Sequence, residues 1–196
     1  MSRNLILAAL LVSGVSAADP LPTDAPPDLD QQAIGVAIGT AGGGRVTPGG
    51  FRVAGHYLYQ LSDVDWFDGA ASFTFGSGAA GCFRDRDDHE ICDHSVASGA
   101  GAELQAGIRR YFSAQGRYRP FARLALGVGL ARYSSDSVTG LTFSLHGAGG
   151  LRARITDTLS ITAQGGFIGG VGAFNHSLGA QPVLGLELEA GVEFRL

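Results

Sequence analysis

The only two cysteines of the chain, Cys82 and Cys92, lie in one polar, acidic segment. An even number of cysteines in an oxidising compartment predicts a disulfide, which would stabilise this segment by about 3 kcal/mol in the chain-entropy model. A metal site is the alternative, because other candidate ligands lie nearby: Asp85, Asp87, Asp88, His89, Glu90, Asp93 and His94. Their order matches neither an EF-hand nor a zinc site with paired cysteines, so we expect a disulfide and no metal.

A second group of residues, near the end of the chain, has the types needed for acyl-transfer chemistry. His176 and Ser177 are adjacent, and Glu187 follows ten positions later. In such a set the imidazole takes the proton of the serine hydroxyl and the carboxylate orients the imidazole. Adjacent residues of a strand point to opposite faces, so this pair would need a bend in order to meet. We keep the three as hydrolase candidates, but we expect a protein that is not an enzyme and needs no cofactor.

The elements that position these residues follow a signal peptide. A short basic start is followed by an apolar run over 5–12 and small residues over 15–18, so residues 1–18 predict a cleaved secretory signal. Four prolines and four aspartates make 19–32 a flexible lead. The remaining part, 33–196, is long enough for one domain.

The last 13 residues alternate strictly between apolar and small or charged side chains, which is typical of a long strand with two different faces. The apolar members are Leu184, Leu186, Leu188, Ala190, Val192, Phe194 and Leu196. The same alternation recurs in seven earlier segments, within 34–39, 51–60, 67–75, 103–109, 123–130, 141–152 and 159–167. The sequence therefore predicts eight amphipathic strands.

The polar faces of these strands indicate which kind of barrel or sandwich they form. Those faces are rich in glycine and alanine, interrupted by arginine, glutamate, glutamine and histidine, and the chain contains no lysine. Small residues beside compensating charges suit the narrow lumen of an eight-stranded barrel, whereas soluble strands often carry protective lysines on their exposed face. We therefore predict an all-β protein: an eight-stranded, antiparallel, up-and-down transmembrane β-barrel with its apolar face toward lipid.

The connections support this interpretation. The predicted periplasmic turns, 62–65, 113–119 and 156–158, are short, while the outward loops, 42–50, 76–99, 134–140 and 169–181, include the two longest. Aromatic residues near the turns predict an interfacial girdle: Tyr57, Tyr59, Trp66, Phe67, Phe112, Tyr118 and Phe121. The acidic cysteine segment then lies in the longest outward loop.

Charged residues on the inward face could form an ion or proton path or a network of salt bridges that fills the lumen. We expect the network, because unpaired buried charges are costly and eight strands leave room only for side chains. Its predicted members are Arg52, Glu103, Arg109, Arg123, Arg152, Glu187 and Glu189, with His56 and His146 on the same face. Glu187 and Glu189 should find arginine partners.

Over 33–196 the pattern resembles the small bacterial outer-membrane β-barrel family, which includes the OmpA transmembrane domain and OmpX-like proteins. The end of the chain resembles the signal by which the barrel assembly machinery recognises such proteins, through Val192, Phe194 and Leu196, with Leu196 where phenylalanine is usual. The resemblance implies an outer-membrane location. It also implies three kinds of partner: the assembly machinery, periplasmic chaperones, and outer-membrane lipid and lipopolysaccharide.

The late His176, Ser177 and Glu187 set is similar to that of the lipid A 3-O-deacylases, which are also eight-stranded barrels. That family separates its histidine and serine by one residue, whereas here the two are adjacent. The function expected is therefore structural or a surface interaction through the outward loops, such as envelope integrity or adhesion to a surface ligand. A narrow porin or small-molecule transporter is the alternative, a deacylase-like hydrolase the third, and the net charge of −4 argues against nucleic acid.

Overall fold

A computed structural model describes residues 31–42, 47, 49–76, 81–84, 89–93, 99–133, 138–175 and 179–196. It contains ten strands: β1 (Gln32–Gly42), β2 (Gly50–Gln60), β3 (Asp65–Gly76), β4 (Gly81–Arg84), β5 (Glu90–Asp93), β6 (Gly99–Tyr111), β7 (Tyr118–Tyr133), β8 (Val138–Arg154), β9 (Leu159–Phe174) and β10 (Gly179–Arg195). None of the described residues belongs to a helix that is long and apolar enough to cross a membrane.

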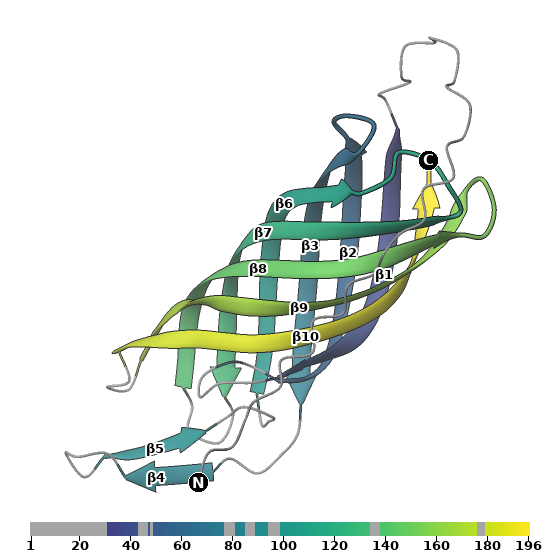
Figure 1. Cartoon of the computed structure of the whole chain (residues 1–196). Helices are drawn as coiled ribbons and strands as arrows, with labels where there is room; N and C mark the ends of the chain where they lie inside the picture. The colour runs from purple at the N-terminus through teal and green to yellow at the C-terminus, as the bar shows by residue number, and fades with distance from the viewer. Residues whose placement is uncertain are drawn as a thin grey trace, which may run out of the picture.

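Eight of the strands close into a barrel, in the order β1-β10-β9-β8-β7-β6-β3-β2 (Figure 1). Each neighbouring pair is antiparallel, and β10 closes the sheet on β1 from Ala33 opposite Arg195 to Gly42 opposite Leu186. Closure leaves no unpaired sheet edge. An open edge would expose unpaired backbone N–H and C=O groups to lipid, which is energetically costly. The predicted fold, an eight-stranded antiparallel up-and-down barrel, is confirmed.

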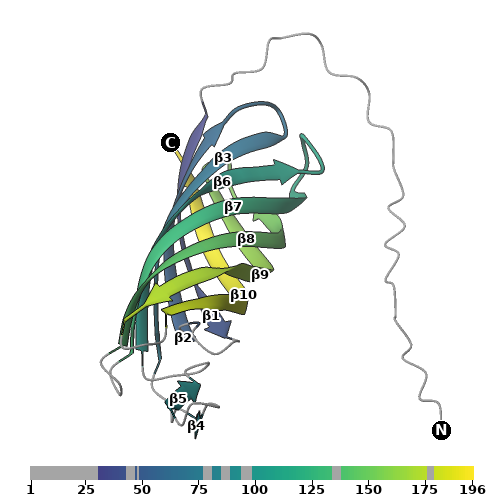
Figure 2. The same cartoon turned by 90° about the vertical axis from the view of Figure 1, so that its left-hand side faces the viewer.

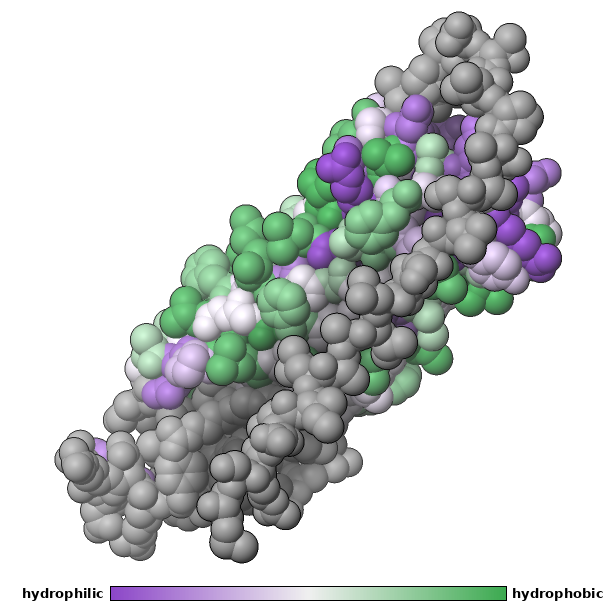
Figure 3. Space-filling view, in the orientation of Figure 1, coloured by the Kyte–Doolittle hydropathy of each residue, from purple (hydrophilic) through white to green (hydrophobic). Residues whose placement is uncertain are grey.

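The two faces of the barrel wall have opposite character. Side chains that point outward are mostly apolar and exposed, and Figure 3 shows them as a hydrophobic surface along the wall. Side chains that point inward include most of the charged residues of the strands, and most of these are buried. A soluble barrel has the reverse arrangement, so this wall is built to face lipid rather than water.

The two ends of the barrel also differ. The short connections 61–64, 112–117 and 155–158 lie at the same end as Gln32 and Leu196, where the backbone N–H of Leu196 donates to the carbonyl of Gln32. We call this the turn end. At the other end, the loop end, β4 and β5 form a separate two-stranded hairpin beyond the barrel (Figures 1 and 2).

Two of the predicted loops, 134–140 and 169–181, have the wrong bounds. The predicted loop 169–181 is strand as far as Phe174 and again from Gly179, and β8 already begins at Val138. The glycines of β9 concealed this, because they break the apolar alternation. One of them, Gly170, is needed for close strand packing, because a Cβ there would come within 2.8 Å of the Cα of Ser144 on β8. The β4–β5 hairpin inside the longest loop was not predicted.

The predicted aromatic girdle is wrong for two of its members. Trp66 and Phe121 point into the barrel and are 3% and 2% exposed. They pack with Tyr111 at the turn end, with ring centroids 6.3 Å apart for Trp66–Tyr111 and 5.7 Å apart for Tyr111–Phe121. Ala33 and Leu58 complete this apolar cluster, which we call the turn-end plug.

A second buried apolar cluster lies in the loop-end half of the barrel. Its members are Ala131, Tyr133, Val138, Ile168, Phe174 and Val183, and we call it the loop-end plug. The lumen is therefore layered, with an apolar cluster toward each end and the charged residues between them.

Candidate functional site

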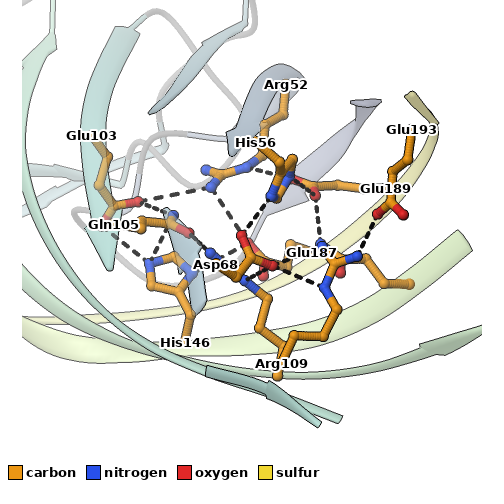
Figure 4. A network of polar contacts seen from close by, with 12 residues as sticks. Arg52, His56, Asp68, Glu103, Gln105, Arg109, His146, Glu187, Glu189 and Glu193 are labelled. Atoms are coloured by element: carbon orange, nitrogen blue, oxygen red, sulfur yellow. Dashed lines mark hydrogen bonds and ion pairs between the residues drawn. The ribbon is translucent and has the colours of Figure 1, made fainter. Parts of the chain in front are cut away.

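Asp68 on β3 is the centre of the polar network in the lumen (Figure 4). Its carboxylate accepts hydrogen bonds from Arg109 Nε at 2.9 Å and from Arg123 Nε at 3.0 Å, and it lies 2.9 Å from His56 Nδ1. These partners come from β6, β7 and β2, so one carboxylate connects four strands. The Asp68 side chain is fully buried, and such a charge is stable only with its partners in place.

Arg52 on β2 organises the network toward the loop end. Its Nε donates to Glu189 Oε1 at 2.7 Å, its Nη1 donates to the Thr74 hydroxyl at 3.2 Å, and its Nη2 lies 3.6 Å from Glu187. The other oxygen of Glu189 accepts from Gln164 Nε2 at 2.7 Å. Glu187 and Glu189, near the end of the sequence, thus meet an arginine from the second strand of the barrel.

Arg109 carries the network toward the turn end. Its Nη1 binds Glu193 on β10, whose second oxygen lies 3.0 Å from Arg152 Nε. The Arg109 guanidinium also stacks over the Phe121 ring, 4.6 Å from its centroid. The charged residues in the middle of the lumen are therefore in direct contact with the turn-end plug.

His146 on β8 sits in an arrangement that resembles a hydrolase triad. The Ser144 hydroxyl lies 3.0 Å from His146 Nε2, and His146 Nδ1 lies 3.3 Å from Glu187. The carboxylate of Glu103, however, lies 3.0 Å from the same Nε2 and also binds the Ser144 hydroxyl. An imidazole held between two carboxylates suits a buried cation better than a general base. The geometry is that of an ion-pair network.

The lumen has room for these side chains because glycines face them. A Cβ on Gly127 would collide with the Glu103 carboxylate and the Ser144 hydroxyl. A cavity of about 40 Å³ remains beside Arg52, Glu103 and Ser144, and one of about 10 Å³ remains beside Arg109. Those volumes hold about three waters and about one water. The described residues therefore fill the lumen with side chains.

The structure places the seven predicted lumen residues in this one network. Asp68 and Glu193 were missed, although alternation puts both on the inward face: Asp68 shares a face with Ser72, and Glu193 with Glu189. The signal was present in the sequence, but neither residue was connected with the arginines opposite. Only coordinates give the register that brings Asp68 beside Arg109 on the neighbouring strand β6, and the contact that joins Glu193 on β10 to Arg109 across the lumen.

The remaining predicted site residues are placed as follows. His176 and Ser177 lie outside the described residues, while Glu187 lies in the lumen, bound to His146 and near Arg52. Cys82 and Cys92 are directly opposite each other in the β4–β5 register. Val192 and Phe194 are exposed on β10, and Leu196, directly after it, is also exposed. Within the described ranges no group of three or more His, Cys, Asp or Glu side chains could hold a metal ion.

Comparison with known proteins identifies the fold. No family model matches the chain, and no curated protein matches it. Among solved structures, Neisserial surface protein A (NspA) matches with a TM-score of 0.56 and 15% identity, covering 84% of this chain and 95% of that one. This is the fold of the small outer-membrane β-barrels.

A second solved structure gives the same result. Ail, the attachment invasion locus protein of Yersinia pestis, in complex with the heparin analogue sucrose octasulfate, matches with a TM-score of 0.51 and 14% identity. The match covers 85% of this chain and 98% of that one. At this level of identity the likeness concerns the fold, and the lumen network must be understood from this chain's own residues.

Proposed function

We propose that this chain is a non-enzymatic outer-membrane barrel protein that anchors a surface-exposed loop end. The observation that carries the proposal is the layered lumen, with charged residues paired at its centre and an apolar plug toward each end. Such a barrel is a rigid support rather than a conduit, and function on a rigid support belongs to its loops.

Three features support the outer-membrane location. The sequence predicts a secretory signal over 1–18, the outward wall is apolar, and the fold matches NspA and Ail. A closed barrel can cross a membrane because every backbone N–H and C=O group forms its hydrogen bond with a neighbouring strand. We place the turn end in the periplasm and the loop end outside the cell, since outer-membrane barrels have short periplasmic turns and longer external loops.

A narrow porin is the alternative function. It would need a continuous water path, whereas the cavities beside Arg52 and Arg109 hold only a few waters. We therefore expect no steady single-channel openings when the purified protein is inserted in planar lipid bilayers. Regular openings that scale with salt concentration would contradict the plugged lumen and favour the porin.

The loop segment suggests the chemistry of a partner. Between Cys82 and Cys92 the sequence carries four acidic residues and two arginines, so its net charge is negative. Ail is described in complex with a heparin analogue, which is a polyanion. An acidic loop repels polyanions, so we propose that this loop end binds basic surfaces instead.

The hairpin also supports a disulfide. In an antiparallel pair, residues that lie directly opposite have Cα atoms about 4.5–5.5 Å apart, which is within the range that a disulfide bridges. Cys82 and Cys92 are such a pair. We propose that they are bonded in the exported protein, and mass mapping of non-reduced peptides tests this. Two free thiols would contradict it.

The surface role is tested by replacing residues 80–97 with a short Gly-Ser linker. Cells that display the full barrel should bind poly-lysine-coated surfaces more than cells with the linker variant, and neither should bind heparin-coated surfaces. A variant with Asp85, Asp87 and Asp88 changed to Asn keeps the hairpin but reduces its charge, and it should lose most of the same binding. Equal binding by all three would contradict a role for this loop.

A further inference from the structure

The outward wall is not uniformly filled. One row of outward-facing residues runs across five strands, with each residue directly opposite the next, and we call such a row a rung. It consists of Phe73, Ala102, Leu130, Leu141 and Ala173. The alanines of this rung are far smaller than their neighbours. They leave a shallow groove of about 670 Å³ on the lipid-facing surface near the loop end. This volume is within the range of ligand sites.

The next rung toward the loop end turns the groove from apolar to polar. Ala100 on β6 lies opposite Arg132 on β7, and Arg132 lies opposite Thr139 on β8. Asn175 joins this rim by donating from Nδ2 to the Thr139 hydroxyl at 3.1 Å. All of the rim residues also line the groove. The groove thus has an apolar floor and a polar rim with one cation.

The guanidinium of Arg132 is available for binding at this rim. It is exposed and points outward, and no ion pair joins it to a carboxylate of the described ranges. An outward arginine near the membrane surface extends its charge toward the headgroup region. The phosphates of the lipid headgroups are anions that can pair with this arginine, and a guanidinium binds phosphate with paired hydrogen bonds.

A second groove supplies a comparison within the same molecule. It measures about 650 Å³ and crosses the wall of β1, β10, β9 and β8 along the rung Ile38, Ala190, Ala163 and Leu151. Its outward-facing residues carry no charge; its lining residue Glu189 points into the lumen and binds Arg52. The two grooves have similar size and apolar floors, but only the first has a cation at its rim.

We propose that the groove beside Arg132 binds a phosphorylated acyl lipid of the outer leaflet, with an acyl chain over Ala102 and a phosphate on Arg132. An outward hollow in the wall of a membrane protein is filled by lipid chains, and the arginine selects among them by headgroup charge. This inference rests on the proposed orientation, in which the loop end lies at the outer leaflet. There the lipid of this chemistry is lipid A.

Native mass spectrometry of the folded barrel, titrated with lipid A, tests the proposal. We expect one retained lipid A per barrel and binding about tenfold or more weaker for Arg132→Gln, the loss typical of a charge-assisted contact. Dephosphorylated lipid A should bind the native protein as weakly as phosphorylated lipid A binds Arg132→Gln. Ala102→Leu, which fills the groove, should weaken binding of both lipids.

Ala163→Leu is the matched control, because it fills the uncharged groove with the same side chain. It should leave lipid A retention unchanged. The proposal is overturned if Arg132→Gln binds as the native protein does, or if Ala163→Leu and Ala102→Leu have equal effects, which would indicate lipid that covers the wall without preference. Each variant is checked for barrel closure by the gel-mobility difference between boiled and unboiled samples. A closed barrel that binds no lipid A contradicts this inference but leaves the proposed function standing.

Discussion

The inward and outward faces of the same strands follow opposite rules. On β7 the inward residues include Arg123, whose Nε donates to the Asp68 carboxylate, and Gly127, where the missing Cβ leaves room for the Glu103 and Ser144 side chains. The outward residues Leu124, Leu126 and Leu130 face the exterior and require only an apolar surface. Specificity is therefore concentrated inside the barrel, while the outside is defined by composition.

This difference has a physical origin in the two surroundings. A buried ion that loses its partner leaves the opposite charge without water or counterion, and the cost is that of an unpaired buried charge. An outward leucine is surrounded by fluid chains, so one apolar side chain replaces another with little loss. Substitutions should accordingly be costly inside whenever they break a pair, and costly outside only when they add a charge.

The largest effect is expected for Asp68→Asn. The amide keeps the shape of the side chain but leaves the guanidiniums of Arg109 and Arg123 without their shared anion, which should cost about 3–5 kcal/mol of the free energy of unfolding. Urea denaturation in lipid vesicles measures it. Ser72→Ala is the control on the same strand and face, because the Ser72 hydroxyl has no hydrogen-bond partner among the described residues. Equal stability of the two variants would show that the network does not hold the barrel together.

The next largest effect is expected for Leu126→Arg on the outward face. Leu126 is 68% exposed at the middle of β7, where an arginine in the hydrocarbon layer costs about 2–4 kcal/mol. Phe112→Arg places the same charge at the turn end, where the cost should fall to about 0–1 kcal/mol. Unfolding in vesicles measures both. If Leu126→Arg is as stable as Phe112→Arg, the outward wall does not face the centre of a bilayer.

A smaller effect distinguishes glycines that face the lumen from those that face outward. Gly127→Ala forces the Glu103 carboxylate and Ser144 hydroxyl to move, and overpacking of this kind costs about 1–3 kcal/mol. Gly55 points outward on β2, and a Cβ there would meet no atom within 4 Å. Gly55→Ala should therefore leave the unfolding free energy unchanged. Similar losses for both would indicate that the glycines act through backbone flexibility rather than through space.

Much of this fold could be predicted from the sequence because a strand's period of two separates its faces without knowledge of its neighbours. The alternation placed Arg52, Glu103 and Glu187 inside and predicted the eight strands of the barrel. It could not show that Asp68 lies between Arg109 and Arg123, since alternation within a strand gives its two faces but not its register with the neighbouring strands. Periodicity also fails where glycine replaces the apolar residue, as in β9.

The misplacement of Trp66 has a different cause. Its position near a turn suggested an interfacial role. Trp66 is, however, two residues from Asp68 on the same strand, so both side chains lie on the inward face, and this odd or even position along the strand is its parity. Closeness to a turn indicates depth along the barrel, and only parity indicates the face. The turn-end plug was missed because aromatic residues at that depth were assigned to the girdle without regard to parity.

The smallest effect is spectroscopic and tests that plug directly. Trp66 is the only tryptophan of the chain, so its fluorescence reports a single site. Because its ring packs against Tyr111 inside the barrel, brominated phospholipids in the vesicle should quench it only weakly. A variant that combines Trp66→Phe with Phe67→Trp moves the indole to the neighbouring outward position at the same depth, where the same lipids should quench it strongly. Strong quenching in the native protein, equal to that of the double variant, would show that Trp66 faces lipid as part of the girdle. It would contradict the turn-end plug.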